Sequence, residues 1–359
     1  MTRIYNFSAG PSMLPPPVLE RIGADVPSWR GTGVSAMELS HRGAAFREIA
    51  EKTQADFRAL LRIPDHYRIL FLAGGATLQF AALPLNLLGA KRTISFFDTG
   101  AWSKKAIMEA RKYAAVEIVA SSASSGYTTI PPREHWRIAA NTAYAHYTAN
   151  ETIDGVEFPF IPDVGSVPLV SDMSSTLLSR PIDVERFGLI YAGAQKNLGI
   201  AGLSIVIVRE DLLDRARADT PTVLNYAVQA QQGSMANTPP TFAWYVLGLV
   251  LEWLRDQGGV VEIEKRNMSK ALKLYEFIDS SDLFANAVEK SVRSRMNVPF
   301  RLTEPLESDF LSESVAAGLL NLKGHRSVGG MRASIYNAMP EAGVEALISF
   351  MKDFEQRGG

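Results

Sequence analysis

Two charged residues follow two short apolar runs in the middle of the chain. Residues 168–171 are followed by Asp172, and residues 187–192 lead through Gly-Ala-Gln to Lys196. If both runs are strands, each strand end delivers one charged group. A lysine that forms a Schiff base with an aldehyde, and a carboxylate that keeps a pyridine nitrogen protonated, are what pyridoxal 5'-phosphate (PLP) chemistry requires. The spacing therefore predicts a PLP site with Lys196 and Asp172 as catalytic residues.

Either residue alone has a simpler explanation, because Asp172 could cap a helix and Lys196 could be a surface lysine. The neighbours of Lys196 favour the chemical interpretation. Small residues and the segment Gly199–Gly202 flank it, and the β-branched run 204–208 predicts a buried strand. Apolar surroundings should lower the pKa of this lysine and keep its amine nucleophilic near neutrality.

Other segments could hold a phosphate or a planar ring. Strand 67–72, the turn 73–77 and helix 78–88 form an arrangement that directs backbone N–H groups at a phosphate, although the turn is neither a Walker loop nor a three-glycine dinucleotide motif. Trp102 follows strand 93–97 and could stack on a pyridine ring, although a tryptophan there is more often part of the core. Thr152 also follows a predicted strand, 141–147.

Cationic residues gather in two places. His41 and Arg42 precede a predicted helix, where an anion would be favoured, although a solvated basic pair is the simpler interpretation. The segment 323–332 carries Lys, His and two Arg residues around two adjacent glycines. Exposed charge is the default interpretation there, but the composition also suits a loop that wraps an anionic ligand.

The order of elements indicates an α/β protein. Strands and helices alternate from about residue 65 to 210, which predicts a large domain with a mostly parallel sheet covered by helices on both faces. Strands 297–302 and 332–336 with helices 310–322 and 341–354 predict a smaller α+β domain. We assign residues 16–258 to the large PLP-binding domain, and residues 1–15 and 259–359 to the small one.

Bulk composition excludes several classes of protein. The 359 residues carry a net charge of -1 and have no cysteine, which disfavours nucleic-acid binding and excludes disulfides and thiolate metal sites. No metal is expected. The N-terminus lacks a signal peptide's apolar core, and the apolar run 242–251 is too short to span a membrane. We expect a cytoplasmic protein without membrane contact.

Six blocks of sequence, spread from residue 6 to 340, together resemble the phosphoserine aminotransferases within the class V aminotransferases. They are Asn6-Phe-Ser-Ala-Gly-Pro-Ser-Met-Leu-Pro, Ser40-His-Arg-Gly, Asn150-Glu-Thr-Ile-Asp-Gly, Ala192-Gly-Ala-Gln-Lys-Asn, Asn237-Thr-Pro-Pro-Thr-Phe and Gly329-Gly-Met-Arg-Ala-Ser-Ile-Tyr-Asn-Ala-Met-Pro. The resemblance implies a fold-type I PLP enzyme. It also implies a homodimer with active sites at the interface, which transfers an amino group between O-phospho-L-serine and 2-oxoglutarate and thereby forms glutamate.

The resemblance also assigns roles to single residues. It implies that Lys196 is the Schiff-base lysine, Asp172 the pyridinium partner and Trp102 the ring-stacking residue. Further cofactor contacts are implied for Ala76, Thr77, Thr152 and Gln195, and for Asn237 and Thr238 toward the partner's cofactor. Arg332 resembles the arginine that binds the substrate α-carboxylate. His41 and Arg42, with His325 and Arg326 from the other subunit, match the pocket for the substrate's phosphate or distal carboxylate.

The chain departs from the family's sequence pattern at several positions, and other functions would fit the same fold. Many relatives have a glycine and a basic residue where this chain has Ala76-Thr77, and some have a hydroxyl at the position of Ala9. Another class V enzyme, such as an alanine–glyoxylate aminotransferase, or a non-catalytic scaffold would share the fold. A cysteine desulfurase is excluded because the chain has no cysteine. Whether 4-phosphohydroxy-L-threonine, a substrate in pyridoxine biosynthesis, is accepted is not decided by the sequence.

Overall fold

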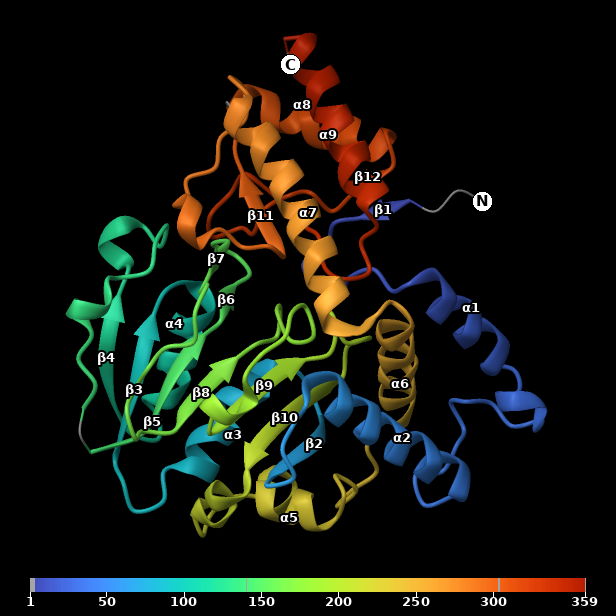
Figure 1. The fold of residues 1–359 in the computed structure, drawn as a ribbon, viewed down its shortest axis with the longest axis vertical. Coiled ribbons are helices and arrows are strands. Elements are labelled where there is room, and N and C mark those ends of the chain that lie inside the picture. Colours follow the sequence, from blue (N-terminus) through green and yellow to red (C-terminus); the bar gives the residue numbers. More distant parts are fainter. Residues whose placement is uncertain (1–3, 140, 303, 359) are drawn as a thin grey trace.

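The computed structural model describes residues 4–139, 141–302 and 304–358. Its largest element is a seven-stranded sheet in the order β2-β10-β9-β8-β5-β3-β4 (Figure 1). The strands are β2 (Tyr67–Ala73), β3 (Thr93–Asp98), β4 (Ala115–Ser121), β5 (Thr142–Thr148), β8 (Leu169–Asp172), β9 (Leu189–Gly193) and β10 (Leu203–Arg209). Strand β10 is antiparallel to both of its neighbours, and the other pairs are parallel. The predicted mostly parallel sheet is confirmed.

Helices cover both faces of this sheet. Successive side chains of a strand point to opposite sides, so Phe71 and Leu72 of β2 belong to different hydrophobic clusters. The cluster that contains Phe71 includes residues of α2 (Ala44–Leu61) and α6 (Thr241–Asp256). The cluster that contains Leu72 is closed by α3 (Ala76–Leu87), α4 (Ala101–Ala110) and α5 (Tyr226–Gln231). Burial on both sides explains why β10 is almost entirely apolar.

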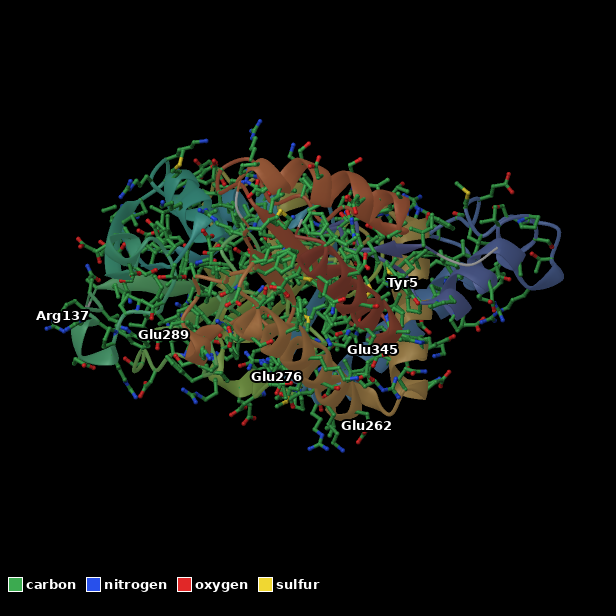
Figure 2. All side chains as sticks on the ribbon, turned by 90° about the horizontal axis from the view of Figure 1, so that it is seen from above. Tyr5, Arg137, Glu262, Glu276, Glu289 and Glu345 are labelled. Atoms are coloured by element: carbon green, nitrogen blue, oxygen red, sulfur yellow. The ribbon has the colours of Figure 1, made fainter. Side chains whose placement is uncertain are left out.

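A smaller group of elements lies above the sheet in Figure 1. It contains α7 (Gly259–Ser280), β11 (Asn297–Phe300), α8 (Glu304–Ala316), β13 (Met331–Ser334) and α9 (Glu341–Gln356). Figure 2 shows this group from above, with Glu276 marking α7 and Glu345 marking α9. Its core also includes Phe7 and Met13 from the N-terminal arm. Helix α7 contributes to this core and, through Val260 and Ile263, to the core beside the sheet. The domain division between residues 258 and 259 stays a prediction.

Two local features differ from the sequence-based expectation. The glycines and prolines of residues 6–17 predict an irregular arm, but this stretch contains the end of β1 (Tyr5–Asn6) and the start of α1 (Pro16–Asp25). Proline is well tolerated in the first turn of a helix, where its missing N–H would have no partner. The predicted helix 310–322 instead ends with α8 at Ala316, because Gly318 adopts a left-handed φ of +77°. The next residues form β12 (Leu319–Leu320), which pairs with β1.

Strands β6 (Asn150–Glu151) and β7 (Val156–Glu157) form a small hairpin after β5. Among the residues that the structure describes, every helix is too short or too polar to cross a membrane.

Candidate active site

A cavity lies at the carboxyl ends of β5 and β8, beside the loop that follows β9. It is lined by Gly75, Ala76, Thr77, Phe80, Trp102, Thr148, Asn150, Thr152, Asp172, Ser174, Gln195 and Lys196. The ends of parallel strands meet at one edge of a sheet, and this is where open α/β sheets bind ligands. Of the residues predicted to contact the cofactor, Asn237 and Thr238 are the two that do not line this cavity.

Lys196 is held inside the cavity with its amine in a polar contact. Its Nζ donates a hydrogen bond of 2.6 Å to Thr152 Oγ1 and lies 5.6 Å from the centroid of the Trp102 ring. Burial lowers the pKa of Lys196 to about 8; the negative charge of Asp172 opposes this shift and the positive charge of Arg332 adds to it. The amine is therefore neutral, and nucleophilic, in a larger fraction of molecules near pH 7 than a solvated lysine would be.

Asp172, the last residue of β8, presents one fixed and one free carboxylate oxygen. Oδ1 accepts hydrogen bonds from the Ser174 backbone N–H (2.9 Å) and the Ser174 hydroxyl (2.6 Å). That hydroxyl in turn accepts the N–H of Gly193 at 3.1 Å. Oδ2 has no such short hydrogen bond to the described residues, although the Tyr191 hydroxyl lies near the carboxylate. The side chain is thus oriented through Oδ1, while Oδ2 is available to a ligand in the cavity.

The opposite wall of the cavity offers donors for an anion. Helix α3 begins at Ala76, and Gly75 before it makes no side-chain cap. The first N–H groups of a helix have no partner within it, so those of Ala76 and Thr77 are free to bind a phosphate. No glycine or basic side chain is needed at these positions for such backbone contacts. The two departures from the family pattern are therefore compatible with a phosphate site.

These features fit PLP. Asp172 Oδ2 could hold the protonated ring nitrogen, the N-terminus of α3 the phosphate, and Trp102 one face of the ring. Three residues that line the cavity carry a buried polar atom with no partner within the described part of the chain: Trp102 Nε1, Thr148 Oγ1 and Asn150 Oδ1. Buried polar groups normally find a partner, so these atoms are consistent with a polar ligand.

The N-terminal arm packs against the loop that carries the lysine. Ser12 donates its backbone N–H to the Gln195 carbonyl at 2.9 Å and its hydroxyl to the Lys196 carbonyl. Gly10 adopts a φ of +145°, and a side-chain carbon there would lie 3.2 Å from Gln195 Cγ. The arm therefore holds the backbone of Lys196 in place, a role that the pattern of residues 6–17 did not reveal.

Arg332, the second residue of β13, is a partly buried cation that forms no ion pair with an acidic residue in the described part of the chain. Burial lowers its pKa, and its Nε is buried with no hydrogen-bond partner among the described residues. Its positive charge lowers the pKa of Lys196, so it acts on the cavity although it does not line it. An unpaired guanidinium is costly to bury, which indicates that an anionic ligand completes its environment.

His325 and Arg326 lie near Arg332 within the same chain. The His325 Nδ1 atom is 2.7 Å from the Ser327 hydroxyl. Burial lowers the pKa of His325, and the positive charges of Lys105, Arg332 and Arg326 lower it further. Lys105, which sequence analysis missed, also has its Nζ 4.0 Å from the Trp102 ring centroid. Its position three residues after Trp102 in a helix was the available signal.

Besides His325, Arg326 and Arg332, four predicted site residues do not line the cavity in the single chain. His41 and Arg42 are in the turn before α2, and neither lines the cavity. Asn237 lines a different cavity, between β2, α3 and α5, and Thr238 beside it is exposed. One chain therefore does not place these four residues in the lining of the cavity around Lys196.

Glu151 and Asp154 are site-adjacent acids that sequence analysis did not single out, although both lie in the block 150–155. Glu151 accepts the backbone N–H groups of Trp102 and Ser103, and Asp154 accepts that of Ala101. Burial and the neighbouring Asp154 raise the pKa of Glu151 to about 8. The available signal was two acids three residues apart directly after a predicted strand.

Comparison with known proteins gives one consistent result. The family model "Aminotransferase class-V" matches residues 4–347. A phosphoserine aminotransferase of Hahella chejuensis is 56% identical over 356 residues, which are 99% of both chains. The solved phosphoserine aminotransferase from Bacillus circulans subsp. alkalophilus superimposes with a TM-score of 0.98 at 46% identity over 100% of both chains. A PLP-bound phosphoserine aminotransferase from Trichomonas vaginalis gives a TM-score of 0.94 at 42% identity, covering 98% of this chain and 100% of the other.

Proposed function

This chain belongs to the class-V aminotransferases and is a PLP-dependent transaminase, and from this premise we propose that its substrates are O-phospho-L-serine and 2-oxoglutarate. The products are 3-phosphohydroxypyruvate and L-glutamate, and the reaction belongs to serine biosynthesis. The observation that carries this choice is Arg332, which forms no ion pair among the described residues, with the Arg326 guanidinium and the His325 imidazole beside it. Phosphoserine and glutamate both carry an α-carboxylate and a second anionic group, so one set of cations serves both.

Each residue of the cavity has a task in this reaction. Bound PLP supplies an aldehyde that takes the amino group and a ring that withdraws electrons. Asp172 Oδ2 keeps a proton on the ring nitrogen, because a negative charge there favours the protonated form. Lys196 is the base that carries a proton between the substrate's α-carbon and the cofactor's C4' carbon. Thr152 orients the Lys196 amine through its 2.6 Å hydrogen bond.

Substrate recognition completes the proposal. Arg332 binds the α-carboxylate, and the distal anion is bound by His325 and Arg326 together with His41 and Arg42. The family resemblance takes His325 and Arg326 from the other subunit, but both lie beside Arg332 of their own chain. We therefore place His41 and Arg42 instead, with Asn237 and Thr238, on a second copy of the chain in a homodimer. Support for this arrangement comes from their position away from the cavity of their own chain.

A coupled assay tests the substrate assignment. Phosphoserine, alanine and 4-phosphohydroxy-L-threonine are compared as donors to 2-oxoglutarate, with Lys196→Ala as the blank. We expect kcat/KM for phosphoserine to exceed that for alanine by more than about 100-fold, because alanine lacks the distal anion that the cations bind. Equal use of alanine would favour an alanine–glyoxylate type of activity instead. No activity with any donor would favour a binding scaffold.

A further inference from the structure

We propose that Glu151 is a positioning residue of the cofactor site. It accepts a hydrogen bond from the backbone of Trp102 and thereby sets the orientation of the indole ring at the cavity. This inference rests on the proposed role of Trp102 beside the cofactor ring. Glu151 itself does not line the cavity, so it would act through Trp102.

The hydrogen bonds lie at the first turn of α4. Glu151 Oε2 accepts the N–H of Trp102 at 2.8 Å, and Oε1 accepts the N–H of Ser103 at 2.9 Å. Asp154 Oδ2 accepts the N–H of Ala101 at 2.8 Å. Three N–H groups at the start of the helix, which have no partner within it, are thus bound by two side chains of one loop.

The local packing is built around this contact. A side-chain carbon at Gly100 would lie 2.5 Å from Glu151 Cδ and 2.6 Å from Asp154 Oδ2, so only glycine admits both carboxylates. Glu151 is fully buried, with 0% of its surface exposed. Burying a carboxylate is costly, whereas an exposed serine or aspartate would cap a helix at little cost. The buried acid therefore needs a reason beyond helix capping.

The indole supplies that reason. Its Nε1 has no partner in the described part of the chain, so no hydrogen bond fixes the ring itself. Lys105 lies over the ring at 4.0 Å from the centroid, but its side chain is long and exposed. Trp102 also packs against the hydrophobic cluster that contains Leu72. The orientation of the ring thus depends on this packing and on where the backbone of Trp102 is held, and Glu151 holds that backbone.

The same loop also reaches the catalytic lysine. Thr152, the next residue, accepts the hydrogen bond of Lys196 Nζ, and its hydroxyl lies 3.3 Å from the Ser175 hydroxyl. Asn150, the preceding residue, bonds to Ser175 Oγ and to Asn297 Oδ1 of β11, both at 2.8 Å. Glu151 is therefore held from both sides, and a shift of its carboxylate cannot be absorbed by movement of the loop.

The test is a double-mutant cycle of Glu151→Gln and Trp102→Phe. Glutamine has the same size, but its amide presents N–H groups to one of the two backbone donors. The dissociation constant of PLP is measured by equilibrium dialysis, and the visible circular dichroism of the bound cofactor reports its orientation. We expect Glu151→Gln to weaken PLP binding about tenfold, and by less than about twofold when Trp102 is already phenylalanine.

Asp25→Asn is the matched control. Asp25 is a buried carboxylate between α1 and α6 that accepts the Tyr245 hydroxyl at 2.7 Å, far from the cavity in the fold. This variant should lose stability but bind PLP within about twofold of the parent and keep its dichroism, since a lost hydrogen bond acts locally.

The outcomes separate the inference from the proposed function. The inference fails if Trp102→Phe weakens PLP binding and Glu151→Gln does not. It also fails if Glu151→Gln weakens PLP binding equally in the parent and in the Trp102→Phe variant, because Glu151 is then merely structural. If Trp102→Phe has no effect, the role of Trp102 fails first. Should Glu151→Gln not fold, Asp154→Asn replaces it in the same double-mutant cycle. A loss of PLP affinity of about threefold that depends on Trp102 supports the inference, and a loss that does not depend on Trp102 overturns it.

Discussion

The cofactor cavity and the cations around it are built in different ways. Thr152, Asp172 and Lys196 are buried, with 3%, 5% and 8% of their surfaces exposed. Thr152 follows β6 of the small hairpin, Asp172 is the last residue of β8, and Lys196 lies in the loop after β9. Arg42 and Arg326 are exposed and lie in turns separated by most of the chain. The groups proposed to do the chemistry are thus fixed by one chain's sheet, whereas Arg42 and Arg326, proposed to recognise the substrate, are dispersed.

Electrostatics gives a reason for the difference. A lysine that must be partly neutral has to be buried, because burial is what lowers its pKa. Cations that must stay charged and attract an anion lose less by remaining solvated until the anion arrives. The comparison predicts that changes in the cavity abolish chemistry, whereas changes in the outer cations alter recognition.

Removing the amine of the cavity should have the largest effect. We expect Lys196→Ala to lower the transamination rate by at least about 10,000-fold, because Lys196 supplies the amine among the described residues that line the cavity and is proposed as both nucleophile and base. The rate is measured with phosphoserine and 2-oxoglutarate in the coupled assay. Lys112→Ala, at an exposed lysine of the same fold, is the control and should match the parent. A Lys196→Ala enzyme with the parent's rate would contradict the cavity's assignment.

The burial of Lys196 should also be visible in the stability of the cofactor-free protein. Its pKa is about 8 when folded against 10.5 for an ordinary lysine. Between these pH values the unfolded chain binds a proton that the folded chain does not, so the free energy of unfolding should rise with pH, by up to about 3 kcal/mol.

Urea unfolding from pH 7.5 to 10.5 measures this dependence. Other groups titrate in the same range, so the quantity of interest is the difference between the parent and Lys196→Met, which has a similar volume without the amine. Parallel pH profiles of the two proteins would show that the lysine is not desolvated in the folded state.

Changing an outer cation should alter recognition and spare the cavity. We expect Arg42→Ala and Arg326→Ala to raise KM for phosphoserine by about 10- to 100-fold, the loss expected for one charge-assisted contact, with little change in cofactor absorbance. Equal turnover of the variants and the parent would remove the anion-pocket hypothesis.

Mixing variants decides which chain supplies Arg42. If it acts from the partner, a hybrid of Arg42→Ala and Lys196→Ala chains has one site with both residues intact. Half of the dimers in an equal mixture are hybrids, each with one restored site of two, so activity should recover to about a quarter of the parent's. No recovery would place Arg42 and Lys196 of the same chain in one site.

The smallest effect is expected where the two regions meet. Lys105 lies over Trp102 and its charge reaches His325. Lys105→Met should raise KM for phosphoserine by about two- to fivefold, as expected for an exposed cation near an anion site, and leave KM for alanine unchanged. A greater effect on PLP affinity than on KM would instead assign Lys105 to the cavity.

The sequence predicted the residues that line the cavity better than the contacts that hold those residues in place. Asp172 and Lys196 follow strong apolar runs, and the order of strands and helices is enough to place both at one edge of a parallel sheet. Glu151 was missed because its partner N–H groups belong to α4, about 50 residues earlier in the chain. Strand β12 was missed because a two-residue strand has no periodicity and exists only through its pairing with β1.

The sequence by itself determined the type of fold and the cofactor, and it predicts Asp172 and Lys196 as the residues that perform the chemistry, because periodicity and residue type are local properties. Tertiary structure decided how those residues are tuned: the pKa of Lys196 near 8, the free Oδ2 of Asp172 and the grip of Glu151 on Trp102. Each of these depends on burial and on contacts between segments far apart in the chain, and hydrogen bonds and desolvation act through space rather than along the sequence.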